Sequence, residues 1–407
     1  MKLFQKLLLA PTAIGLFAPI TASASEANLM DVSNYSQVDV EVTQDTFKPL
    51  STKNPLLAGG EGLGQDLSND FDGDTFSSTT SATFASNWAI GSVDGTANAN
   101  NEKVATTFDW SLSTITSFTG NDSLDVTIKG GSGDVVLTEL DFFASGRAAD
   151  GDQDEILNVD SISYTSSVGD YLTYFFGFGT DGSLLYNTAC AYEAQTEVFS
   201  SCGLTQVGLD AGYGTNFGAT IDVGNGIFVS VGYEGEGTSA AALMSEEGGD
   251  HLGGQVAYIQ DNWGVSLSAS TRDYASQAKL GSTINTVQDA TAINGFFIPS
   301  LDGFPSISFG YEWSHAVFEG HTDQTDNATN YFVGFQFDDL GNGTLGVAVG
   351  SKALVQENQD AETMWEAYYA YNYADGITIT PLVYVKEEAD QGVDDETGII
   401  LKTSFEF

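Results

Sequence analysis

An alternation of apolar and polar residues with a period of two runs through most of this chain from residue 81 onward. In WGVSLSASTR (263–272), Trp263, Val265 and Leu267 alternate with glycine and serine, and SISFGYEWS (306–314) repeats the pattern with aromatic residues. Successive side chains of a β-strand point to opposite faces, so this period gives a strand one apolar face and one polar face. The alternation predicts an all-β chain.

The chemistry of the two faces indicates which kind of β protein this is. The polar faces are rich in Gly, Ser and Thr, whereas a soluble sandwich usually turns more Lys and Glu to solvent. Small residues around a water-filled lumen and aromatic residues toward lipid are typical of membrane barrels. Tight turns such as 261–262 alternate with long acidic connections such as 387–395. We therefore expect a transmembrane antiparallel up-and-down β-barrel, with a soluble secreted β-protein as the alternative.

The pattern predicts about 16 strands, each about ten residues long, which is enough to cross an apolar band of ~25 Å at a steep tilt. The segment VVLTELDFFA (135–144) also has a strand-like pattern. It would make the number of strands odd, so we assign it to a loop folded against the barrel. The expected strands are 81–91, 103–118, 122–130, 156–165, 170–178, 211–221, 226–234, 250–260, 263–272, 290–299, 304–316, 327–338, 343–352, 363–373, 376–386 and 396–407.

The first 24 residues have the order of a secretory signal peptide. Lys2 and Lys6 precede an apolar run, and Ala22-Ser23-Ala24 supplies the small residues of a cleavage site, with a cut after Ala27 as the alternative. Residues 25–80 are polar, with scattered Pro and Gly, and are expected to form a periplasmic lead-in or plug with little regular structure. Residues 81–407 are expected to form the barrel.

The last expected strand ends on an aromatic residue. In LKTSFEF (401–407), Leu401, Phe405 and Phe407 fall on the face that should meet lipid. A strand that closes a barrel against the first strand needs no tail. Phe405 and Phe407 also resemble the terminal recognition signal of many bacterial outer-membrane barrels, so we expect them to serve in membrane assembly.

Charge and residue usage exclude several classes of function. The net charge of −44 would repel nucleic acid phosphates, so no nucleic acid partner is expected. The acid cluster DGDQD (150–154) departs from the EF-hand spacing, and we predict neither a metal site nor a cofactor. The histidines His251, His315 and His321 have no nucleophile–base spacing, so no enzymatic activity is predicted.

The two cysteines, Cys190 and Cys202, lie close together in an exported chain and are predicted to form a disulfide, with free thiols or a metal pair as alternatives. They fall in the longest connection, 179–210. A loop folded into the lumen and stapled in this way would narrow a pore. The alternative is a loop that caps the outside or grips a neighbouring subunit.

The alternation also assigns charged residues to the lumen. A wall that opposes basic and acidic side chains would create a transverse field in the pore, and the excess of acids predicts a mild preference for cations. For each residue the alternative is a solvated charge near the rim. The pore-lining candidates are Arg272, Lys352, Lys386, Lys402, Glu234, Glu312, Asp338, Glu366 and Glu406.

Three stretches resemble a known family. The start MKLFQKLLLAPTAIGLFAP with SEANLMDVSNYS, and the segments 108–131 and 156–179, resemble cyanobacterial outer-membrane porins of the carbohydrate-selective (OprB-type, S-layer-homology) group. The resemblance implies a trimeric barrel that lets small solutes and ions diffuse, and some members are described as iron-uptake porins. Two departures stand out: 25–80 has no recognisable S-layer-homology domain, and no Arg occurs between 148 and 271.

The sequence thus predicts a porin of the bacterial outer membrane, in contact with outer-membrane lipid and forming a homotrimer. Small hydrophilic solutes and ions, including sugars or metal cations, would diffuse passively through its lumen. The alternative is a non-conducting structural or adhesive barrel that acts through acidic extracellular loops.

Overall fold

The computed structural model describes residues 79–95, 103–132, 137–140, 142, 157–204, 207–209, 214–238, 242–245, 248–274, 286–301, 303–318, 327–351, 355–356, 362–387 and 394–407. The predicted signal peptide (1–24) lies outside these ranges. So does the predicted lead-in (25–80), except for its last two residues. No helix in the described ranges is long and apolar enough to cross a membrane.

Strands dominate the described residues. The strands are β1 (Thr80–Asp94), β2 (Val104–Thr116), β3 (Asp122–Gly131), β4 (Asn158–Val168), β5 (Leu172–Phe178), β6 (Thr215–Gly224), β7 (Ile227–Gly235), β8 (Asp250–Gln260), β9 (Trp263–Tyr274), β10 (Thr286–Phe297), β11 (Ser306–Phe318), β12 (Asn327–Phe337), β13 (Gly343–Ser351), β14 (Val355–Gln356), β15 (Thr363–Ala374), β16 (Ile377–Lys386) and β17 (Glu396–Glu406). Two 3-10 turns, η4 (Thr138–Leu140) and η5 (Glu197–Gly203), complete the set.

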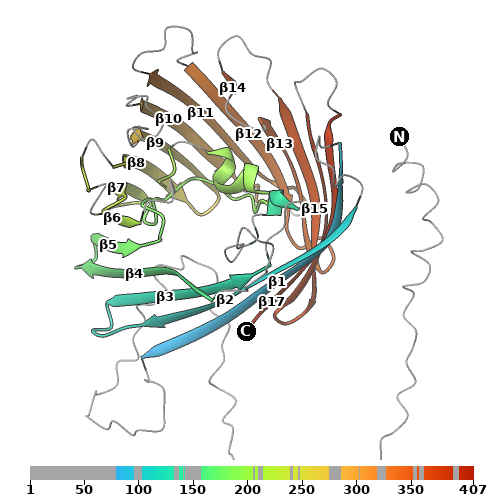
Figure 1. Ribbon diagram of the computed structural model, residues 1–407, viewed down its shortest axis with the longest axis horizontal. Coiled ribbons are helices and arrows are strands. Elements are labelled where there is room, and N and C mark those ends of the chain that lie inside the picture. Colours follow the sequence, from blue (N-terminus) through green and yellow to red (C-terminus); the bar gives the residue numbers. More distant parts are fainter. Residues whose placement is uncertain are drawn as a thin grey trace, which may run out of the picture. The chain divides into compact units, whose positions relative to one another are not determined.

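The strands form one closed antiparallel sheet. Apart from β14, each strand pairs with the next strand along the chain, and β1 pairs with both β2 and β17, which closes the ring. Of the 17 strands in the described sheet, β14 is a two-residue pairing on β12, so sixteen strands make the wall. Figure 1 shows these strands around η4 and η5. The prediction of an all-β, up-and-down antiparallel barrel of about 16 strands is confirmed.

Burial in this barrel is the reverse of that in a soluble protein. On β9, the apolar Trp263 and Leu267 are 42% and 53% exposed, whereas Ser266 and Ser268 between them are 1% exposed. On β11, Phe309 and Trp313 are exposed in the same way. The soluble alternative required these apolar rows in a dry centre, and they face outward instead. An apolar outer face with all backbone groups paired around a ring is what a bilayer demands of a β-protein.

The seam between β1 and β17 joins the two ends of the barrel. Phe407 exchanges two backbone hydrogen bonds with Phe84, and their rings lie 5.2 Å apart. Leu401 is 43% exposed on the outer face, as the alternation predicts. The role of Phe405 and Phe407 in assembly stays a prediction.

A cation on the outer face should therefore destabilise the barrel according to its depth. We expect Leu267→Arg, near the middle of β9, to cost about 2–4 kcal/mol of folding free energy in a bilayer. Thr271→Arg is the matched control: it lies on the same exposed face closer to the strand end, and should cost at most about 1 kcal/mol. Denaturant titration of the barrel in lipid vesicles measures both. Equal costs for the two variants would contradict the lipid-facing assignment.

Candidate functional site

The connection between β5 and β6 lies along the inner wall of the barrel. The backbone amides of Ala189 and Ala191 donate hydrogen bonds to the hydroxyls of Ser266 on β9 and Ser308 on β11, both at 2.9 Å. Two residues further on, the amide of Glu193 donates to the side-chain oxygen of Gln336 on β12 at 2.8 Å. Alternate amides of this segment thus bind three strands of the wall, β9, β11 and β12. Of the two positions considered for loop 179–210, the structure shows the one inside the barrel.

Glu366 on β15 is the strongest anchor of this loop. Its carboxylate is fully buried and accepts hydrogen bonds from the hydroxyls of Tyr192 and Thr196 at 2.8 and 2.6 Å. The amides of Gln195 and Thr196 also donate to it, at 3.2 and 3.0 Å. Burial raises the pKa of the Tyr192 phenol, and the Glu366 carboxylate raises it further. Charge-assisted bonds of this kind are about twice as strong as neutral ones, so one carboxylate holds a whole turn of the loop.

Two further glutamates lie under the same loop. Glu312 on β11 is fully buried and accepts a hydrogen bond from the amide of Val207 at 3.1 Å. Glu234 on β7 is also 0% exposed and lies beside Gly182. All three glutamates face the interior, as the alternation predicts, but the loop covers them. In this structure Glu366 and Glu312 therefore bind the loop instead of lining open lumen, and Glu234 is covered with them.

The disulfide joins Cys190 to Cys202, with their Cα atoms 6.0 Å apart. It closes the part of the loop that contains η5. The rings of Tyr192 and Phe199, within this closed part, each lie 5.4 Å from Phe332 on β12. The interior on this side of the barrel is therefore packed with aromatic side chains.

A second segment enters the barrel from the connection between β3 and β4. Leu137 and Leu140 are buried in the same apolar cluster as Phe199 and Ile400. The described residues of the strand-like stretch 135–144, which are 137–140 and 142, include η4 and pack inside the barrel instead of joining its wall.

Lys386 on β16 anchors this second segment. It forms an ion pair with Glu139 of η4, and its Nζ lies 3.7 Å from a carboxylate oxygen of Glu396 on β17. Tyr384 donates a hydrogen bond to Glu396 at 2.8 Å. Lys386, predicted to line the pore, is 14% exposed at its side chain and is engaged with these carboxylates.

The part of the inner wall that the two segments leave accessible runs over β17, β1, β2, β3 and β4. Inward-facing residues on β7 to β15 are mostly buried. On this arc, Ala89, Val93 and Ile400 are buried too, near one end of their strands, whereas the inward-facing residues over the rest of these strands are half-buried and mostly polar. We call this arc the open wall. Its residues include Asn87, Asp109, Ser111, Thr127, Lys129, Lys402 and Ser404.

Charges on the open wall lie close to charges of opposite sign. Lys129 forms an ion pair with Asp160 at 3.0 Å. Lys402 interacts electrostatically with Asp109 and Glu366. Asp125 adds a further half-buried carboxylate on β3.

The residues that the sequence predicts to line the pore also include Arg272, Glu406 and Lys352. Arg272 is half-buried on the inner face of β9, in register with His251 and Gln288. Glu406 is exposed at the end of β17, and Lys352 lies outside the described residues.

Asp338 lies just beyond β12 and is exposed. Its carboxylate accepts a hydrogen bond from Gln336 at 2.9 Å. Glu193 of the loop lies near this carboxylate, and its side chain is exposed. Glu193 of the loop and Asp338 of the wall thus place two exposed carboxylates near each other at the end of β12.

Within the described residues, no group of three or more His, Cys, Asp or Glu side chains is placed to hold a metal ion. His251 is buried in the inner wall and His315 binds Asn327 at 3.1 Å. His321 lies outside the described residues.

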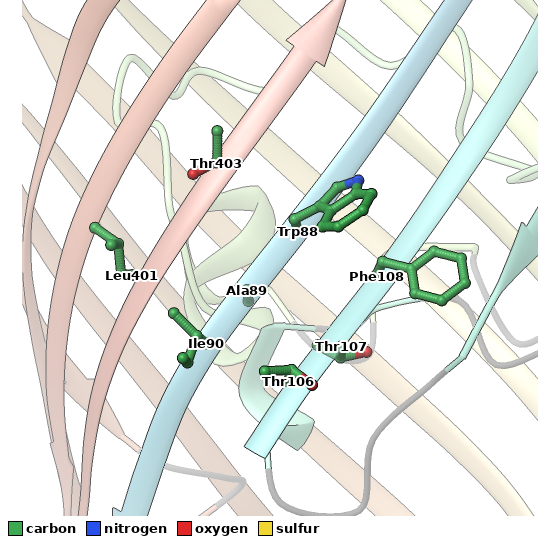
Figure 2. A pocket seen from close by; sticks show the side chains of 8 residues that line it. All are labelled: Trp88, Ala89, Ile90, Thr106, Thr107, Phe108, Leu401 and Thr403. Carbon is green, nitrogen blue, oxygen red and sulfur yellow. The ribbon is translucent and has the colours of Figure 1, made fainter. Parts of the chain in front are cut away.

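A groove of about 320 Å³ lies on the outer wall across β17, β1 and β2. Figure 2 shows Trp88 and Phe108 side by side on neighbouring strands there, with Ile90 and Leu401 beside them. The two rings are 6.0 Å apart. Because Trp88 and Leu401 belong to the exposed apolar face, this groove faces away from the lumen.

Several residues of the open wall are not among the pore-lining residues predicted from the sequence. They include Asp109, Asn87, Lys129 and Asp125. The signal for them was present, since Asp109 shares the polar face of an expected strand with Ser111 and Ser113. The sequence did not indicate which polar faces the β5–β6 loop and the η4 segment would cover.

Comparison with known proteins yields similar structures but no sequence relatives. No family model matches the chain, and no curated protein matches it. An anion-selective porin from Comamonas acidovorans has a TM-score of 0.57 at 13% identity, over 81% of this chain and 99% of that one. OprB of Pseudomonas putida has a TM-score of 0.56 at 12% identity, over 81% and 94%. The trimer form of OmpT, an outer membrane protein of Vibrio cholerae, has a TM-score of 0.54 at 9% identity, over 81% and 99%.

These identities show a shared fold. A closed barrel with an apolar outer face is a form in which a β-protein can span a lipid bilayer.

Replacing Glu366 should loosen the loop. In Glu366→Ala, four donors lose their acceptor in a buried site, which we expect to cost about 3 kcal/mol or more. The thermal midpoint should fall, and current through a single barrel should become noisier as the loop moves. Asp375→Ala removes an exposed carboxylate from the turn between β15 and β16, away from the loop contacts described above, and is the control. If both variants melt and conduct alike, Glu366 is not the anchor.

Proposed function

We propose that this chain is a porin through which small hydrophilic solutes and ions diffuse passively along the open wall. The observation that carries the proposal is the division of the interior. Polar side chains stay accessible on β17 to β4, while the remaining wall is covered by the loop and the η4 segment. A polar strip beside a fixed, stapled loop is the arrangement that a diffusion pore needs. No step of catalysis is required of any residue.

We further propose a mild preference for cations. The open wall contributes Lys129 and Lys402 against Asp109, Asp125 and Asp160, and the loop adds the exposed carboxylates of Glu193 and Glu197. Acids thus outnumber bases along the described path. A net negative lining raises the local concentration of cations, and salt weakens the effect. The Comamonas porin is described as anion-selective. In this chain, the scarcity of bases on the open wall argues against that selectivity.

The resemblance to cyanobacterial OprB-type porins supports sugars or metal cations as solutes, and the fold shared with OprB is in keeping with it. We also propose that the chain forms a homotrimer, since a neighbour of the same fold is described in a trimer form. Export by the predicted signal peptide would bring the chain to the outer membrane.

A non-conducting barrel is the second candidate. It is favoured by the apolar cluster inside the barrel, where Leu137, Phe199 and Tyr384 meet. If these side chains closed the interior completely, the acidic loops would carry the function.

Planar bilayers distinguish the two. The purified protein should give stepwise conductance, and a potassium chloride gradient should give a zero-current potential of the sign expected for cation preference. The magnitude of this potential should fall as the mean salt concentration rises. A silent barrel would support the structural or adhesive role, and a potential of the opposite sign would contradict the cation preference.

A further inference from the structure

Three strands at the seam of the barrel bring polar side chains together on the open wall. Asn87 on β1 is in register with Asp109 on β2 and with Ser404 on β17. Lys402 precedes Ser404 by two residues and faces inward in register with Ala89. Residues two apart on a strand share a face, so these four polar side chains lie on one inner patch.

A chain of hydrogen bonds fixes the carboxylate in this patch. Ser404 donates from its hydroxyl to the side-chain oxygen of Asn87 at 2.8 Å. The side-chain nitrogen of Asn87 donates to Oδ1 of Asp109 at 2.9 Å. The two bonds set the orientation of the amide, and the amide in turn holds Asp109. The carboxylate of Asp109 is thus positioned by Asn87 of β1 directly and by Ser404 of β17 through Asn87.

Lys402 interacts electrostatically with two carboxylates that differ in exposure, Asp109 and Glu366. Glu366 is 0% exposed and already accepts four hydrogen bonds from the loop, whereas Asp109 is half-buried on the open wall. Of the two anions near Lys402, Asp109 is therefore the one that a solute in the pore can approach.

Resting on the function proposed above, we propose that Asp109, positioned by Asn87 and Ser404, determines the ion selectivity of the pore, and that Lys402 is the counter-charge that keeps the preference mild. The permeant species that this carboxylate favours is a small hydrated metal cation. Anions meet the same carboxylate as a repulsive charge. Lys402 attracts anions at the same level of the pore and thereby reduces the discrimination.

The test is the zero-current potential of single-charge variants in a potassium chloride gradient. A unit charge about 6 Å from an ion in water-like surroundings changes its local concentration about threefold at low salt. Because the carboxylate attracts potassium and repels chloride, each about threefold, Asp109→Asn should lower the potassium-to-chloride permeability ratio about tenfold, and Lys402→Gln should raise it by a similar factor. Asn87→Ala leaves the charge in place but frees the carboxylate, and should give a smaller decrease.

Asp375→Asn is the matched control, because it removes one carboxylate from the exposed turn between β15 and β16. If the wild-type barrel conducts but Asp109→Asn shifts the ratio no more than Asp375→Asn does, the assignment of Asp109 is overturned while the porin function stands. If Lys402→Gln fails to shift the ratio upward, the counter-charge role is overturned. A wild-type barrel without conductance would overturn both the porin function and this inference.

Discussion

Closure of the sheet is the constraint on which the rest of this structure depends. Lipid offers no hydrogen bonds, so a β-protein in a bilayer must pair every backbone amide and carbonyl within its own sheet. Here the ring closes where β1 pairs with β17, and Phe84 and Phe407 complete the seam. Once the ring is closed, the period of two sends one set of side chains to lipid and the other to the interior. The outward set is apolar and the inward set polar for that reason.

A ring of sixteen strands encloses a wide interior, and this chain fills much of it with its own connections. The inward serines and glutamines find their partners there: Ser266, Ser308 and Gln336 accept hydrogen bonds from alternate amides of the loop. Buried polar groups need partners, since an unpaired one costs about 1–3 kcal/mol. The sequence predicted that these small polar residues line the lumen. On β9, β11 and β12 they instead form the surface to which the loop binds.

The covered and open parts of the interior divide the charged residues into two groups. Glu366, Glu312 and Lys386 hold infolded segments: the two carboxylates accept hydrogen bonds from the loop, and Lys386 forms an ion pair with Glu139 of η4. Asp109, Lys129 and Lys402 lie on the open wall. Both groups face inward, but only the second lies on the accessible wall, where a solute can approach it.

The sequence alone determined the fold class, the number of strands and the two faces of the strands with a clear alternation, such as β9 and β11, because strand geometry couples position to orientation at every second residue. The interior position of Glu234, Glu312 and Arg272 followed in the same way, while Lys352 lies beyond the described residues. Only the tertiary structure decided which inward residues stay accessible. That outcome depends on where two irregular segments fold, through contacts between residues as distant in sequence as Thr196 and Glu366. No local period encodes such contacts, so the open wall and Asp109 on it emerged from the folded barrel.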